Sequence, residues 1–183
     1  MVERWASEMR NSHWRIAILI SIGVAGVAWP KAQSPLFVWN VSRSVPVGLY
    51  AIAEHQPSRG EIAVLRLPVQ MRNLADARGY PQSHAVLMKP VAALAGDTVC
   101  RHGAIITING QLAARALIAD TSGRPLPRWS GCHDTDDRQI FVLSDEQQSF
   151  DGRYFGLVES RHVIGTAAAV TVEAVLSAAS NKW

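Results

Sequence analysis

The chain has 183 residues, of which 48% are hydrophobic and 18% charged, so it can bury a core and is too apolar to be disordered. Its 9 prolines and 13 glycines follow no period, which excludes a fibrous protein. The net charge of +3 is small and the positive residues are scattered, which argues against nucleic-acid binding. A mean hydropathy of +0.06 is high for a cytosolic domain and indicates that part of the chain meets a membrane.

A membrane-spanning segment is predicted near the N-terminus. Residues 16–29 form an uncharged run of 14 residues with arginines before it. A spanning helix needs about 20 residues. The run becomes long enough if Trp14 and Trp29 lie at the two interfaces and Arg15 extends to the headgroups. The arginines favour an orientation with the N-terminus on the cytoplasmic side.

Three interpretations of this run remain open: an uncleaved signal anchor, a cleaved signal peptide and a buried core helix. We favour the anchor, because the small-x-small site at 32–34 is followed by Pro35, a poor residue for cleavage, and because the run is apolar all round. Either membrane interpretation exports everything after residue 30. The predicted organisation is a cytoplasmic N-terminus at 1–15, an anchor or signal segment at 16–30, and a periplasmic domain at 31–183.

The exported part consists mainly of short predicted strands and turns. Asn109 and Gly110 between two apolar runs indicate a two-residue β-hairpin, and Gly79 is a predicted helix end. Because helix is scarce, the pattern favours an all-β to β-rich α+β fold. The predicted elements are an extended segment at 36–53 with a turn at 46–48, a strand at 61–67, a helix at 69–78, an apolar run at 84–94, a hairpin at 103–115, a loop at 118–138, a strand at 139–143, a loop at 145–152 and a last strand at 162–172.

Two cysteines, Cys100 and Cys132, fall in the exported part. Two cysteines without a nearby pair of histidines do not make a zinc site, and in an oxidising compartment a disulfide is expected. It would close a loop of about 33 residues and stabilise the fold by roughly 3–4 kcal/mol. The alternative is two buried free thiols.

Lys89 is the first candidate for chemistry, because it stands inside the apolar run and directly before Pro90. Burying an ammonium group costs several kcal/mol, so desolvation would lower the pKa of Lys89 towards neutrality. A neutral buried amine can act as a general base. The alternative is a lysine at a strand end whose ammonium group reaches water.

Two serines form the second candidate. Ser42 and Ser44 stand beside the predicted turn, and side chains two residues apart in an extended chain lie on one side. One hydroxyl could attack while the other donates to a developing oxyanion. The alternative is two ordinary serines at a turn.

The third candidate is the segment 149–156, S-F-D-G-R-Y-F-G. Asp151 and Arg153 are two residues apart and could pair, while Ser149 could hydrogen-bond the amine of Lys89. Such a loop would orient the base; the alternative is a solvated turn.

Taken together and in this order, the three segments resemble the signal peptidase I family, and most closely its conjugative-transfer branch, the TraF-type peptidases that mature pilin subunits. The residues Asn40–Tyr50 resemble the serine box N-x-S-x-S-x-P-x-G-L-Y, Lys89–Asp97 the lysine box K-P-V-A-A-L-x-G-D, and Ser149–Gly156 the box S-F-D-G-R-Y-F-G. The short strand Gly60–Val64 also fits, and so do both cysteines.

The resemblance implies that Ser44 is the nucleophile and Lys89 the general base. General signal peptidases have a proline three residues after the serine, whereas Pro46 follows Ser44 by two, which leaves Ser42 as the alternative nucleophile. The remaining matches support the dyad: Ser42 in the oxyanion hole together with the Ser44 N–H, Ser149 orienting the lysine, and Asp151 with Arg153 as an ion pair behind the site.

The resemblance also implies a signal-peptidase-like antiparallel β fold with one N-terminal transmembrane helix, in the inner membrane with the catalytic domain in the periplasm. The expected activity is that of a serine endopeptidase that cleaves a pilin precursor for conjugative transfer, and in that branch the pilin's own amine can resolve the acyl-enzyme and cyclise the product. The expected partners are the pilin precursor, the membrane and other conjugation proteins, with no cofactor, metal or nucleic acid. Two alternatives stay open: a general type I signal peptidase, and a non-catalytic pilus-assembly subunit of the same fold.

Overall fold

The computed structural model describes residues 37–80 and 86–171. They all belong to the second of two compact units, Ser34–Trp183. The first unit, Met1–Gln33, contains the whole of the predicted anchor at 16–30, and that segment lies outside the described residues. Within the described ranges, no helix is long and apolar enough to cross a membrane. The predicted division of the chain at residues 15 and 30 therefore stays a prediction.

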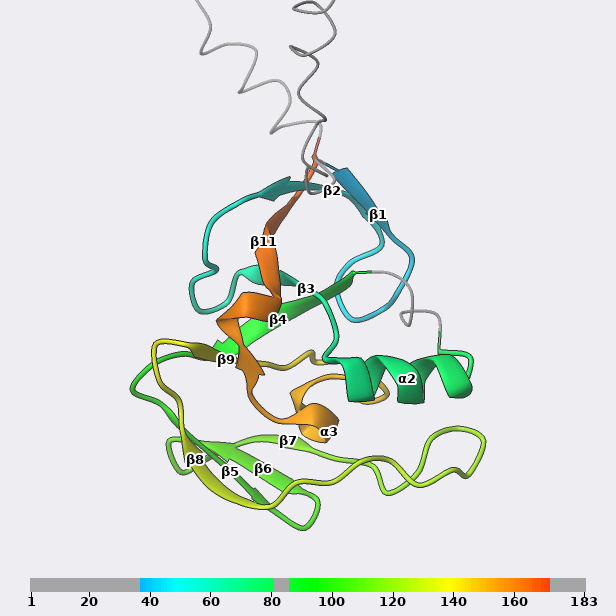
Figure 1. Ribbon diagram of the computed structural model, residues 1–183, viewed down its shortest axis with the longest axis vertical. Helices are drawn as coiled ribbons and strands as arrows, with labels where there is room; N and C mark the ends of the chain where they lie inside the picture. Colours follow the sequence, from blue (N-terminus) through cyan, green and yellow to red (C-terminus); the bar gives the residue numbers. More distant parts are fainter. Residues whose placement is uncertain (1–36, 81–85, 172–183) are drawn as a thin grey trace, which may run out of the picture. The chain divides into compact units, whose positions relative to one another are not determined.

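The described part is built mostly from antiparallel strands (Figure 1), which confirms the prediction of a β-rich fold. Short strands follow one another closely, as the frequent turn residues of the sequence predict. The elements are β1 (Phe37–Asn40), β2 (Gly48–Ala53), β3 (Ile62–Leu65), α2 (Val69–Ala77), β4 (Leu87–Ala93), β5 (Thr98–His102), β6 (Ile105–Ile108), β7 (Gln111–Arg115), β8 (Gly131–Asp134), β9 (Gln139–Val142), α3 (Gly152–Phe155), β10 (Val158–Glu159), a 3₁₀ turn η1 (Ser160–His162) and β11 (Val163–Ala169).

Seven strands form one sheet in the order β1-β2-β11-β3-β4-β9-β10. In its middle, β4 pairs with β3 from Leu87 to Pro90, whereas β9 pairs with β4 only at Val91 and Ala93. The edge of β4 that faces β9 therefore has no strand partner at residues 87–89 within the described part of the chain. This unpaired stretch of backbone includes Lys89 itself.

Four strands form a second sheet in the order β7-β6-β5-β8. At the predicted hairpin between β6 and β7, Asn109 and Gly110 both have positive φ, 52° and 78°, as a type I′ turn requires. The prediction of a hairpin is thus confirmed. In the separate pairing of β5 with β8, Cys100 stands directly opposite Cys132.

The alternation of side chains along β4 divides them between two apolar clusters. Leu87 and Val91 belong to the larger cluster, and Met88 belongs to the smaller one. Lys89 shares the side of Leu87 and Val91 and is only 1% exposed, which explains how a lysine comes to be buried. The larger cluster also takes in residues of the second sheet and of α3, so that it joins these elements: Val99, Ile106 and Tyr154.

Two predicted loops contain regular structure. The segment 118–138 includes β8, whose four residues carry no apolar alternation and are mostly exposed; they become a strand by pairing with β5. The segment 145–152 ends where the one-turn helix α3 begins at Gly152, and four residues are too few to show helical periodicity. Both errors arise where pairing or capping, rather than the apolar pattern, sets the local structure.

Candidate active site

Ser44 lies in the short connection between β1 and β2, and Asn40 holds that connection in shape. The side-chain amide of Asn40 donates hydrogen bonds to the carbonyl oxygens of Ser42, Val45 and Pro46 at 2.8, 2.8 and 3.0 Å. Asn40 is buried, and its bond to the Val45 carbonyl oxygen is shielded from water. The folded connection leaves the Ser44 side chain 9% exposed, at the edge of the protein interior.

Lys89 reaches Ser44 from β4. Its Nζ lies within hydrogen-bond reach of Ser44 Oγ and also donates to Ser149 Oγ at 2.9 Å. The two serine oxygens lie 3.4 Å apart. Three residues separated by 45 and 60 positions in the sequence therefore meet at one buried amine, and the predicted proximity of Ser44, Lys89 and Ser149 is present in the structure.

The environment of Lys89 shifts its protonation equilibrium towards the neutral form. Burial lowers the pKa of Lys89 from an ordinary 10.5 to about 8, while Asp151 acts to raise this pKa and Arg153 acts to lower it. Because the two charges act in opposite directions, desolvation is the main cause of the low pKa. An amine with a pKa near 8 can accept a proton from a neighbouring hydroxyl close to neutral pH.

Asp151 and Arg153 form a buried ion pair, with Arg153 Nη1 and Asp151 Oδ2 2.6 Å apart. The Asp151 carboxylate also caps α3 by accepting the N–H of Arg153, and it accepts the N–H of Ser144. Burial raises the pKa of the Asp151 carboxyl, whereas Arg153 and these N–H groups act to lower it. The predicted contact between the two side chains is present, behind the amine rather than in a solvated loop.

Two further contacts fix α3 against the core. A Cβ at Gly152 would lie 2.5 Å from the Phe141 ring and 2.6 Å from the Val142 carbonyl oxygen, so only glycine allows this close approach to β9. Arg101, almost fully buried in β5, donates to the carbonyl oxygen of Arg153. The second sheet thus contributes to the position of the ion pair.

Ser42 takes a different orientation from the one that an oxyanion hole needs. Its Oγ donates to Asn40 Oδ1 at 2.9 Å, and its N–H donates to the same oxygen at 3.0 Å. The structure records no contact between Ser42 and Ser44 Oγ or Lys89 among the described residues. The Ser42 hydroxyl would have to turn away from Asn40 to reach a bound carbonyl group.

Sequence analysis missed Ser144, which follows β9 and is 2% exposed. Its Oγ donates to the main-chain carbonyl oxygen of Ser44 at 2.8 Å. A serine after a strand is ordinarily a turn residue, so nothing in the local sequence marks it. Only the fold brings it to the segment that carries Ser44, 100 residues earlier in the chain.

Cys100 and Cys132 lie with their sulfur atoms 2.02 Å apart, the distance of a disulfide. With His102 they make up the one cluster of three possible metal-binding groups found among the described residues. Sulfur atoms at bonding distance from each other are not two separate thiolate ligands, so this geometry is that of a disulfide rather than of a metal site.

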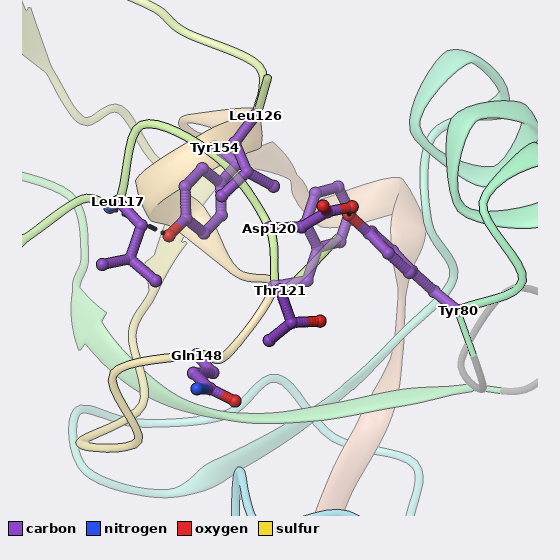
Figure 2. A pocket seen from close by; sticks show the side chains of 8 residues that line it. Tyr80, Leu117, Asp120, Thr121, Leu126, Gln148 and Tyr154 are labelled. Carbon is purple, nitrogen blue, oxygen red and sulfur yellow. Dashed lines mark hydrogen bonds between the residues drawn. The ribbon is translucent and has the colours of Figure 1, made fainter. Parts of the chain in front are cut away.

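A separate cavity of about 230 Å³ lies behind the segment that carries Ser149 (Figure 2). Gln148 and Phe150, the neighbours of Ser149, line it, and Figure 2 shows Tyr154 with its hydroxyl directed at the main chain of Leu117. Neither Ser44 nor Lys89 lines this cavity. The cavity is therefore not part of the site that Ser44 and Lys89 form.

Comparison with known proteins agrees with this geometry. The family model described as "Signal peptidase, peptidase S26" matches residues 11–172. The chain belongs to this family. The resemblance to this family that was inferred from the sequence is thus confirmed. Ser44, Lys89 and Ser149, one from each of the three sequence boxes, are the residues that the fold brings together.

The similar curated proteins are transfer proteins of plasmids. A plasmid transfer protein TraF from Escherichia coli is 35% identical over 160 residues, which cover 81% of this chain and 86% of the relative. A second protein of that name from the same species is 33% identical over 136 residues, which cover 68% and 76%. Among solved structures, a signal peptidase I from Enterococcus faecalis V583 is 21% identical with a TM-score of 0.35, and the match covers 62% of this chain and 98% of that chain.

Proposed function

We propose that this peptidase-family protein is a serine endopeptidase in which Ser44 is the nucleophile and neutral Lys89 the general base. The observation that carries the proposal is the buried contact between Lys89 Nζ and Ser44 Oγ, with the pKa of Lys89 lowered to about 8. Ser149 accepts an N–H of the amine at 2.9 Å. With that N–H engaged, the lone pair of the neutral amine is directed at the Ser44 hydroxyl.

The reaction begins when Lys89 takes the Ser44 proton and Ser44 Oγ attacks the scissile carbonyl carbon. The Ser44 N–H, and the Ser42 hydroxyl once it has turned from Asn40, donate to the oxyanion; such a donor contributes about 3 kcal/mol. The Lys89 ammonium then returns the proton to the leaving amine, and an acyl-enzyme on Ser44 remains. Water, or an amine of the substrate itself, releases the acyl group.

The unpaired edge of β4 at residues 87–89 is the place that we propose for the polypeptide substrate. Val91 N–H bonds to Glu61 across the β3–β4 pair, so by strand alternation the main-chain groups of Lys89 face β3 and those of Met88 face the open side. An extended substrate can add there as a strand, which would bring its scissile carbonyl group up to Ser44 Oγ, on the side that Lys89 leaves free.

We propose a pilin precursor as the substrate, in conjugative transfer. The names and the similarity of the TraF relatives support this narrow assignment. Whether the acyl-enzyme is resolved by water or by the amine of the pilin decides between a linear and a cyclic product. Mass spectrometry of the mature pilin distinguishes the two, since cyclisation removes the mass of one water.

We also propose that residues 16–30 anchor the chain in the inner membrane, with the catalytic domain in the periplasm. The uncharged run and the arginines before it support this topology. The residues that follow the run expose large apolar side chains, Phe37, Trp39 and Val41, each more than half accessible, which suits a domain that works close to lipid. An N-terminus starting after residue 28 in the mature protein would refute the uncleaved anchor.

The decisive experiment compares precursor processing by Ser44→Ala, Lys89→Ala and Ser42→Ala in cells that carry the transfer system. We expect the first two variants to accumulate the precursor at normal enzyme levels, and the third to retain reduced activity. Normal processing by Ser44→Ala and Lys89→Ala would establish a non-catalytic assembly subunit instead. Processing of many unrelated secretory precursors by the wild type would establish a general signal peptidase, and a complete loss confined to Ser42→Ala would move the nucleophile to Ser42.

A further inference from the structure

Ser144 uses all of its polar groups inside the protein. Its N–H donates to Asp151 Oδ2 at 3.1 Å, and its carbonyl oxygen accepts from Arg153 Nη2 at 2.7 Å. Its Oγ accepts the N–H of Glu146 at 3.1 Å and donates to the carbonyl oxygen of Ser44 at 2.8 Å. One 2% exposed residue therefore contacts both the ion pair behind Lys89 and the backbone of the nucleophile.

The bond from Ser144 to Ser44 differs in kind from the other contacts of the nucleophile loop. Asn40 and Tyr50 also bond to the main chain of this loop, but both belong to the same β1–β2 hairpin. Among the hydrogen bonds recorded for the described residues, the one from Ser144 alone ties the backbone of residues 41–47 to the rest of the domain. Without it, the packing of Val45 in the smaller apolar cluster would still hold the hairpin tip on the sheet, but no main-chain hydrogen bond would fix the position of Ser44 relative to Lys89.

We propose that Ser144 is a positioning residue for the nucleophile. By holding the Ser44 carbonyl oxygen, it restrains the ψ angle of Ser44 and the direction in which the side chain leaves the backbone. Ser144 is also hydrogen-bonded to Asp151 and Arg153, the ion pair behind Lys89. One residue therefore helps to fix both the nucleophile and this ion pair. Ser144 touches no reacting atom in this scheme, which rests on the proposed function of Ser44 and Lys89.

The competing explanation is that Ser144 only stabilises the turn after β9. Its bond with the N–H of Glu146 is of the ordinary serine-turn kind and requires only an acceptor. The bond to Ser44 requires the hydroxyl proton as well. The contacts to Asp151 and Arg153 come from the main chain and survive any substitution of the side chain, so a variant without the hydroxyl isolates the bond to the nucleophile from the ion pair.

The test measures cleavage of a fluorogenic peptide that spans the processing site of the pilin precursor, by the purified full-length protein in detergent. In Ser144→Ala, we expect kcat to fall about 10- to 100-fold with KM within about twofold, because misplacing a reacting group by about 1 Å costs on the order of 100-fold. We expect the pH midpoint of kcat to stay where it is, because the burial of Lys89 and its charged neighbours are unchanged. A residue that only supports the turn would lower the thermal midpoint and leave the kcat of the folded protein unchanged.

The pair Ser144→Thr and Ser144→Val keeps the test valid if the alanine variant does not fold. The two variants add the same volume and differ by a hydroxyl against a methyl group, so the threonine variant should retain at least about tenfold more kcat than the valine variant. A matched control is Thr166→Val, which removes another buried hydroxyl that donates to a main-chain oxygen, that of His55 at 3.1 Å. This control should keep the kcat of the wild type.

The outcomes separate the two proposals. A folded Ser144→Ala protein with the kcat of the wild type, or an equal kcat for the threonine and valine variants, overturns the positioning role and leaves the dyad intact. The same loss of kcat in Thr166→Val also overturns it. If the wild type cleaves no faster than Ser44→Ala, the proposed function itself fails, and the positioning role fails with it.

Discussion

The lowered pKa of Lys89 predicts a pH dependence of cleavage that follows the neutral fraction of one amine. With a pKa of about 8 rather than 10.5, about a tenth of Lys89 is neutral at pH 7, against about 0.03% for an ordinary lysine. The buried position therefore raises the concentration of the active base by roughly 300-fold at pH 7. We expect kcat/KM to rise with pH and to reach half of its maximum near pH 8.

The same shift predicts how stability depends on pH. The folded-state pKa of Lys89 lies below its unfolded value, so the unfolded chain binds more protons between pH 8 and 10.5, and stability rises with pH across that window. The burial of the charged amine costs about 3 kcal/mol below pH 8, and this cost disappears towards pH 10.5. Relative to Lys89→Met, the wild type should gain about 2–3 kcal/mol between pH 7 and pH 10.

Two measurements check this reasoning. The pH profile of peptide cleavage reports the pKa in the free enzyme through kcat/KM. Urea denaturation of the wild type and of Lys89→Met at pH 7 and pH 10 reports the linkage without any need for activity. A half-maximal rate near pH 10, together with an equal pH dependence of stability in the two proteins, would show that the amine is charged and hydrated in the working enzyme, and would refute the assignment of Lys89 as the base.

Three further predictions concern the surroundings of the amine and the second sheet. Ser149→Ala removes the acceptor of one Lys89 N–H and should lower kcat about 10- to 100-fold, which peptide cleavage measures, whereas Ser149→Thr should retain most of the activity. Asp151→Asn removes the charge that raises the pKa of Lys89, so the acid limb of the pH profile should move to lower pH; a move to higher pH contradicts this. The double variant Cys100→Ser and Cys132→Ser should lose roughly 3–4 kcal/mol of unfolding free energy in non-reducing urea titrations, and peptide mapping that finds two free thiols would contradict the bridge.

Some of the site was accessible from the sequence on physical grounds alone. A lysine at position 89 inside an apolar run has either to reach water or to be buried with a lowered pKa, and the structure shows the second. The hairpin at Asn109 and Gly110 follows equally directly from the backbone needs of its turn. In both cases one residue type in one local pattern has few physical solutions.

The meeting of Ser44, Lys89 and Ser149 is different, because no local rule relates residues that lie 45 and 60 positions apart. Only the resemblance of three ordered boxes predicted that they converge. Ser144 stayed hidden for the same reason without that help, since it stands just before the third box. The strand β8 was missed because its stability comes from pairing with β5 rather than from apolar side chains of its own.

The balance of charges around Lys89 shows what the fold contributes to the chemistry. Asp151 and Arg153 act on the pKa of Lys89 in opposite directions, so burial causes most of the shift. The main contribution of the ion pair is to hold the segment behind Lys89 in place. Arg153 in turn is held through its carbonyl oxygen by Arg101 and through its side chain by the carbonyl oxygen of Ser144. The pKa of the proposed base is thus lowered mainly by the packing that excludes water. Any change that admits water beside Lys89 should raise its pKa and lower activity near neutral pH, even where every hydrogen bond of the site is preserved.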